Sequence, residues 1–252
     1  MIDALQSFNL TIDLWFLAVL CGIFVGLSKT GLSGMGMLVV PILAGIFGGK
    51  PSVGIMLPML CIGDIFAVRY YHQHAEWSHV LRLMPWTLAG IIIGLFVGNI
   101  VSATQFKDII AVTIMISIAL MVWREQRKDE IVIPTYWWFS ALTGLVGGFA
   151  TMIGNAAGPI MAIYLLSMRL TKNIYIGTGA WFFIIVNLVK VPLHVFVWHT
   201  ITVQTLSFNI ALLPAIAAGA FTGVNAVKKI PEKSYRIFIM IMTTIAALKL
   251  FF

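Results

Sequence analysis

Three charged residues lie inside apolar runs of the sequence, where a charge is costly and has a function by default. Asp64 lies about 12 residues into its run, or about 18 Å at the rise of an α-helix, which is close to mid-membrane. It could carry a coupling proton, pair with a cation such as Lys190, or make a purely structural contact. Lys29 could attract an anion or snorkel to the surface, and Lys190 could pair with Asp64, serve an anion path or snorkel outward.

A glycine-rich motif that occurs twice supplies the other residues able to do chemistry. The stretch 22–41 reads GIFVGLSKTGLSGMGMLVVP, and the stretch 144–163, shifted by 122 residues, reads GLVGGFATMIGNAAGPIMAI. Glycine inside a helix costs about 1 kcal/mol relative to alanine, so these stretches argue against uninterrupted helices. Backbone that breaks at membrane depth is tolerated only where protein buries it or where it lines a watery cavity. Paired motifs of this kind point to the binding site of a transporter.

The chemistry available at such a break is anion binding. A helix that begins in mid-membrane presents free N–H groups and a partial positive charge, and Ser33 and Asn155 are residues that favour the N-cap position. Close helix packing is the alternative role for the glycines. We expect no catalytic residue and no metal ligand. The predicted substrate-binding residues are Lys29, Thr30, Ser33, Gly34, Gly36, Thr151, Asn155 and Gly158, and the predicted intramembrane charges, with a role in coupling, are Asp64 and Lys190.

The composition is that of an integral membrane protein. Of 252 residues, 60% are hydrophobic and only 10% are charged, whereas soluble domains average about 25% charged residues. Uncharged runs such as 83–106 and 191–227 reach the roughly 20 residues that cross a bilayer. The formal charge of +7 is scattered between the apolar runs, so membrane orientation explains it and nucleic acid is not an expected partner.

Ten apolar segments are predicted, at about 11–29, 34–48, 52–71, 80–101, 106–123, 134–152, 156–168, 173–194, 204–227 and 232–252. The second and seventh are too short to cross alone. With the N-terminus outside, twelve Lys and Arg residues fall on the cytoplasmic side and three on the outer side, as the positive-inside rule requires. The twelve are Lys29, Arg69, Arg82, Arg124, Arg127, Lys128, Arg169, Lys172, Lys228, Lys229, Lys233 and Arg236, and the three are Lys50, Lys107 and Lys249.

The two halves of the chain repeat beyond the glycine motifs. At a shift of 123, Asp64 meets Asn187, and at a shift of 129 the pattern Pro-x4-Gly-x3-Gly of residues 85–94 recurs at 214–223. Each half has five segments, and because this number is odd, the two halves must be inverted relative to each other in the membrane. The sequence therefore predicts an all-α membrane protein of about ten transmembrane or half-membrane helices in two inverted five-segment repeats, with broken helices at the glycine motifs. Residues 1–123 form the first repeat, 124–133 a cytoplasmic linker and 134–252 the second repeat.

The glycine motifs, the two Pro-x4-Gly-x3-Gly patterns and the length together resemble the sulfite exporter TauE/SafE family of bacterial membrane permeases. The resemblance covers nearly the whole chain, although the second motif reads Asn155-Ala156-Ala157-Gly158 and the first has Met35 and Met37 between or after its glycines. It implies a multi-pass permease of the bacterial cytoplasmic (inner) membrane. Such a permease exports a small anion such as sulfite or an organosulfonate, with ion coupling and alternating access.

Two other functions stay open at this point. A passive channel for anions or small solutes also fits inverted repeats. A rhomboid-like intramembrane serine protease fits Gly31-Leu32-Ser33-Gly34, with His194 as the nearest candidate base. A duplicated motif argues against a single nucleophile. The expected partners are the anion and the lipid bilayer, a homodimer is open, and no cofactor is expected.

Overall fold

The computed structural model describes residue 8, residues 10–30, 34–126, 137–168 and 170–226, and positions 241, 244, 245 and 248. Within this part of the chain the secondary structure is helical and contains no strand. The predicted all-α class is therefore confirmed. The elements are α2 (Ile12–Thr30), α3 (Met35–Phe47), α4 (Gly49–Tyr71), the short 3₁₀ helix η1 (His72–His74), α5 (Trp77–Ile100), α6 (Ala103–Gln126), α7 (Trp137–Gly154), α8 (Gly158–Ser167), α9 (Lys172–Phe196) and α10 (Val203–Ala226).

Seven helices of the described chain are long and apolar enough to cross a bilayer, namely α2, α4, α5, α6, α7, α9 and α10. The other two, α3 and α8, have 13 and 10 residues. At 1.5 Å per residue they extend about 20 Å and about 15 Å, less than the hydrocarbon core of about 30 Å. These two helices are the predicted second and seventh segments, and they are short in the structure, as expected. The predicted tenth segment, 232–252, lies outside the described residues except for four positions.

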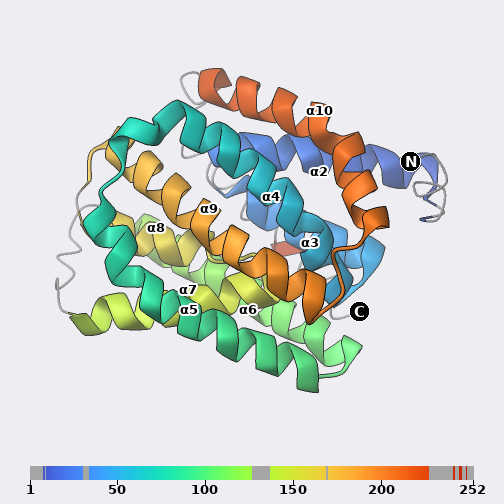
Figure 1. Ribbon diagram of the computed structural model, residues 1–252, viewed down its shortest axis with the longest axis horizontal. Helices are drawn as coiled ribbons and strands as arrows, with labels where there is room; N and C mark the ends of the chain where they lie inside the picture. The colour runs from blue at the N-terminus through green and yellow to red at the C-terminus, as the bar shows by residue number, and fades with distance from the viewer. Residues whose placement is uncertain are drawn as a thin grey trace.

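Six of the seven long helices of the described chain pack in three pairs (Figure 1). Helix α2 lies along α10 at one edge of the molecule, α5 lies along α7 at the opposite edge, and α4 and α9 cross the space between them. In each edge pair, the first helix of one predicted repeat meets the fourth helix of the other. The central pair joins the two third helices. This reciprocal pairing is the arrangement that two related halves would make, and it supports the proposed repeat.

Glycines allow the edge pairs to approach closely. A Cβ atom added at Gly26 of α2 would overlap the backbone of α10 at Ile216, and one added at Gly219 of α10 would overlap the Ile23 carbonyl of α2. The other pair repeats this contact, because Gly148 of α7 meets the Thr87 carbonyl of α5. Helices in membranes use small residues to pack in this way. The packing interpretation therefore holds for the first glycines of each motif, and α2 and α7 run through them without a break.

This close approach predicts which glycines tolerate a side chain. Gly26→Ala should lower the stability of the protein by about 1–3 kcal/mol, because the added methyl group meets backbone that cannot move aside. Gly45→Ala in α3 is the matched control, since a Cβ there meets nothing within 4 Å and alanine favours the helix. Thermal unfolding in detergent measures both. A Gly26→Ala protein as stable as the Gly45→Ala protein would contradict the close packing of α2 against α10.

Candidate functional site

A pocket lies where the two helix breaks face each other. It has a cavity volume of about 170 Å³ and is lined by the end of α2, the start of α3, α4, the end of α6, the break between α7 and α8, α8 and α9. Part of its wall is apolar, with Met56, Leu60 and Phe183. Its glycines and polar residues are Ser28, Lys29, Gly34, Gly36, Asp64, Thr151, Asn155, Gly158, Tyr175, Gly179 and Asn187.

Asn155 forms the break between α7 and α8. Its φ of 52° is left-handed, a conformation that non-glycine residues rarely adopt and that asparagine tolerates best. Its backbone N–H donates to the Thr151 carbonyl at 3.0 Å, which closes the last turn of α7. The prediction that Asn155 is an N-cap is wrong, because α8 begins only at Gly158 and Asn155 instead ends the preceding helix.

The side chain of Asn155 ties this break to two other helices. Its Nδ2 donates to the Val53 carbonyl of α4 at 3.2 Å, and its Oδ1 accepts from Lys190 Nζ of α9 at 2.6 Å. The left-handed turn is thereby held in place. It leaves the first residue of α8, Gly158, exposed at the pocket with no atom near the position of a Cβ.

The break between α2 and α3 also has a left-handed residue, Gly34, one position after Ser33, the residue that aligns with Asn155. Gly34 has a φ of 108° and precedes the first residue of α3, with no side-chain cap on that helix. Gly34 and Gly36 both line the pocket. Ser33, the predicted cap, lies in 31–33 and so outside the described residues. The first N–H groups of an α-helix have no acceptor within the helix, so the starts of α3 and α8 both bring free donors to one space.

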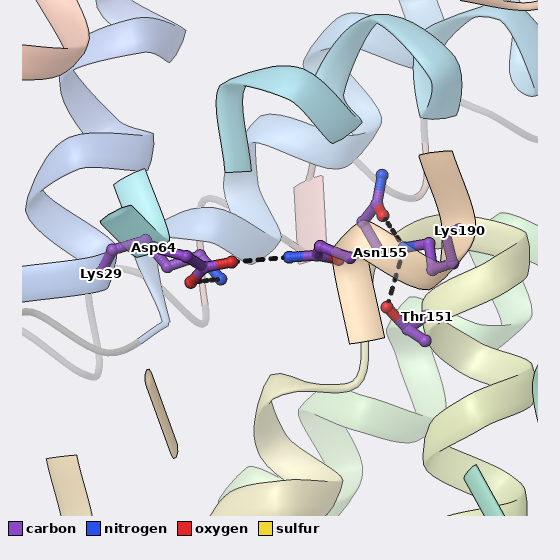
Figure 2. Close-up of polar contacts among 6 residues, drawn as sticks. Lys29, Asp64, Thr151, Asn155 and Lys190 are labelled. Atoms are coloured by element: carbon purple, nitrogen blue, oxygen red, sulfur yellow. Dashed lines mark hydrogen bonds and ion pairs between the residues drawn. The ribbon is translucent and has the colours of Figure 1, made fainter. Parts of the chain in front are cut away.

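Polar side chains form a continuous chain along the wall of the pocket, with Lys190 buried behind it (Figure 2). Lys29 Nζ lies 2.7 Å from Asp64 Oδ1, and Asn187 Nδ2 donates to Asp64 Oδ2 at 2.7 Å. Lys190 Nζ donates to Asn187 Oδ1 at 3.3 Å, to Thr151 Oγ1 at 3.0 Å and to Asn155 Oδ1. Two lysines and one carboxylate thus share a network that spans α2, α4, α7 and α9.

The network differs from the pairing considered from the sequence. The ion-pair partner of Asp64 is Lys29, and Lys190 reaches the carboxylate only through Asn187. Lys29 does not snorkel away, since its side chain is 13% exposed and its Nζ lies 4.6 Å from the centre of the Phe183 ring. Asn187 is not among the site residues predicted from the sequence. Its alignment with Asp64 at a shift of 123 was the available signal.

The repeat relates the two ends of this network. At a shift of 122, Lys29 corresponds to Thr151, and at a shift of 123, Asp64 corresponds to Asn187. The first half therefore contributes a charged pair where the second half contributes neutral side chains. Lys190, which has no charged counterpart in the first half, supplies the cation on the second side.

Two predicted residues lie away from the pocket lining. Thr30 is buried against α10, where its Oγ1 is 2.8 Å from the Ala220 carbonyl and 3.1 Å from the Gly26 carbonyl. Lys190 is fully buried behind Thr151 and Asn155. His194, the base considered for a protease, is also buried, and its Nδ1 is paired with Thr200 Oγ1 at 2.8 Å. Within the described chain, no cluster of three His, Cys, Asp or Glu residues could hold a metal ion.

The seven apolar helices and the polar network buried among them define a multi-pass membrane protein. Comparison with known families then identifies the family of membrane proteins to which the chain belongs. The profile of the family described as "Sulfite exporter TauE/SafE" matches residues 18–250, and the chain belongs to this family of membrane exporters. No curated protein and no solved structure gives a significant match.

Proposed function

We propose that this protein is a secondary transporter that exports a small anion, such as sulfite or an organosulfonate, across the bacterial cytoplasmic membrane by alternating access. The observation that carries the proposal is the convergence of two helix starts and Lys29 on one pocket. Helix N-termini bind anions through free N–H groups and the positive end of the helix dipole. Family membership supports the same substrate class.

The charges of the network suit an anion. Lys29 and Lys190 with Asp64 give a formal charge of +1 when the carboxylate is ionised, and a bound anion offsets it. The apolar wall at Met56, Leu60 and Phe183 could accommodate the organic part of a sulfonate. Each charge-assisted hydrogen bond to the anion contributes about 1.5–3 kcal/mol.

Asp64 offers a means of ion coupling. The carboxylate holds Lys29 at 2.7 Å, so it competes with the anion for that ammonium group. A proton on Asp64 removes the competition and raises the charge of the network by one unit. Binding of a proton and binding of an anion then favour each other, which is a coupling between two sites. The described groups that face Asp64 and can titrate or carry charge are Lys29, Lys190 and Cys61.

Asp64→Asn tests this coupling. Unlike leucine, asparagine keeps the size of the side chain and an oxygen that can accept from Lys29 Nζ, but it loses the charge. We therefore expect a folded protein in which uphill transport driven by a pH gradient falls to background while exchange of anion for anion continues. Both are measured with labelled sulfite in proteoliposomes. Uphill transport at the wild-type level would remove Asp64 from the mechanism.

The transport function itself is tested by flux of labelled sulfite into proteoliposomes. A carrier gives flux that saturates with concentration and is stimulated by unlabelled sulfite on the far side. Flux that is linear with concentration and insensitive to the far side would indicate the channel alternative. Sulfate, taurine and acetate tested in the same assay define the selectivity. Absence of flux and of thermal stabilisation by every anion would contradict the proposal.

A further inference from the structure

The two halves of the chain do not hold the same conformation around the pocket. The positions of α8 and α9 that line the pocket have equivalents in α3 and α4, at shifts of 122 and 123. Helix α3 packs along α4, whereas α8 has few contacts with α9. The cleft between the short and the long helix is therefore open in the second half and closed in the first.

The exposure of equivalent residues agrees with this difference. Tyr175 and Ile176, in the first turns of α9, are partly exposed and line the pocket. Their equivalents Ser52 and Val53, in the first turns of α4, are only 2% and 1% exposed and are not part of it. On the short helices, Ala162 and Leu165 of α8 line the pocket and Val40 and Leu43 of α3 do not, although all four side chains are buried.

Close contacts seal the closed cleft at its far end. Asn155 Nδ2 donates to the Val53 carbonyl of α4 and so joins α4 to the break after α7. The overlap that a Cβ atom at Gly54 would make with Thr200 has an equivalent in the open half, between Gly177 and His74, so it does not distinguish the two clefts. At this end Lys50 Nζ lies 5.1 Å from the Trp198 ring and 5.6 Å from the Phe106 ring. The pocket runs instead toward the start of α9, the side that the count of basic residues predicts to be cytoplasmic.

We propose that the closed cleft between α3 and α4 is the outer half of the anion path, and that it opens when the cleft between α8 and α9 closes. The two halves exchange conformations, so the anion held at the helix breaks faces one side and then the other. Ser52 and Val53 then line the outer cleft, and Lys50 is the first cation that an anion meets at its mouth. This inference rests on the proposed transport function for its substrate, but its motion is measured without one.

Thiol labelling tests the motion in the absence of any anion substrate. The variant is Ser52→Cys in a Cys61→Ala background, and Cys21, fully buried in α2, is the internal control. An impermeant maleimide applied to the outer face of oriented vesicles should label residue 52 over minutes and leave Cys21 unlabelled. Because Ser52 is 2% exposed in this conformation, labelling requires the cleft to open. No labelling at residue 52, or equal labelling at Cys21, would overturn the inference.

A cross-link tests whether transport needs the motion. Val40→Cys with Leu57→Cys, made in a Cys21→Ala, Cys61→Ala background, places buried thiols on the packed helices α3 and α4. An oxidant and bifunctional reagents of increasing length are applied, and the protein that mass spectrometry shows to be linked is assayed. We expect at least a tenfold loss of sulfite flux, retained sulfite binding, and recovery on reduction where the link is a disulfide. Undiminished flux through the linked protein overturns the inference. Failure of the unmodified protein to bind or move any anion counts instead against the proposed function, and labelling at residue 52 then still decides the motion.

Discussion

Asp64→Leu is expected to reduce the folded yield of the protein sharply. The carboxylate pairs with Lys29 at 2.7 Å and is fully buried, so its loss leaves an ammonium group without its counter-charge. Removing one partner of a buried ion pair typically costs about 3–5 kcal/mol, which is a large share of the stability of most proteins. Size-exclusion profiles and thermal unfolding in detergent measure the loss.

The double variant Lys29→Met, Asp64→Leu separates stability from function. Replacing both partners of a buried pair by apolar residues of similar size is often neutral for folding, so we expect most of the folded yield to return. Transport should remain at background, because the ammonium group at the pocket and the carboxylate proposed to carry a proton are both gone. A double variant that folds and transports at the wild-type rate would show that the pair is only structural.

Lys190→Met is expected to lower anion affinity about tenfold or more in a protein that still folds. The change removes a cation of the network and the three hydrogen bonds that Nζ makes to Thr151, Asn155 and Asn187. The turn at Asn155, which positions the start of α8, then loses one of its two side-chain anchors. Methionine is long and apolar, so it fills the space of the lysine without a buried charge.

Leu188→Met is the matched control for this variant. Leu188 is on the same helix and 56% exposed on the lipid-facing surface, away from the network. Its replacement should leave affinity and flux unchanged. Isothermal titration with sulfite compares the two proteins. Equal affinity in Lys190→Met and Leu188→Met would remove Lys190 from the anion site.

Hydropathy and length were sufficient to predict most of the fold. The spans and the two short segments follow from apolar runs that end at polar or glycine-rich stretches, and α3 and α8 begin within two residues of their predicted starts. The functions of the individual glycines were not predictable in this way. Gly26 packs against α10 and Gly36 lines the pocket, yet both are glycines of one motif, and only the neighbouring helices distinguish them.

The charged residues of the site were predictable one by one, but their pairing was not. Asp64 and Lys190 were identifiable because a charge inside an apolar run is costly. That Lys29 reaches Asp64, and that Asn187 stands between Asp64 and Lys190, depends on how α2, α4 and α9 pack together. Asparagine is favoured both at the N-cap of a helix and at a left-handed position that ends a helix. The sequence does not say which of the two roles Asn155 has, and the left-handed backbone of the structure shows that it ends α7.

The most direct test of the central claim is to locate a bound anion. Selenite has the shape and charge of sulfite, and selenium gives an anomalous diffraction signal that marks its position in crystals of the protein. The account predicts one selenium peak in the pocket, within hydrogen-bonding distance of Lys29 Nζ and of backbone N–H groups at the starts of α3 and α8. A peak at any other place in the protein, with this pocket empty, would contradict it.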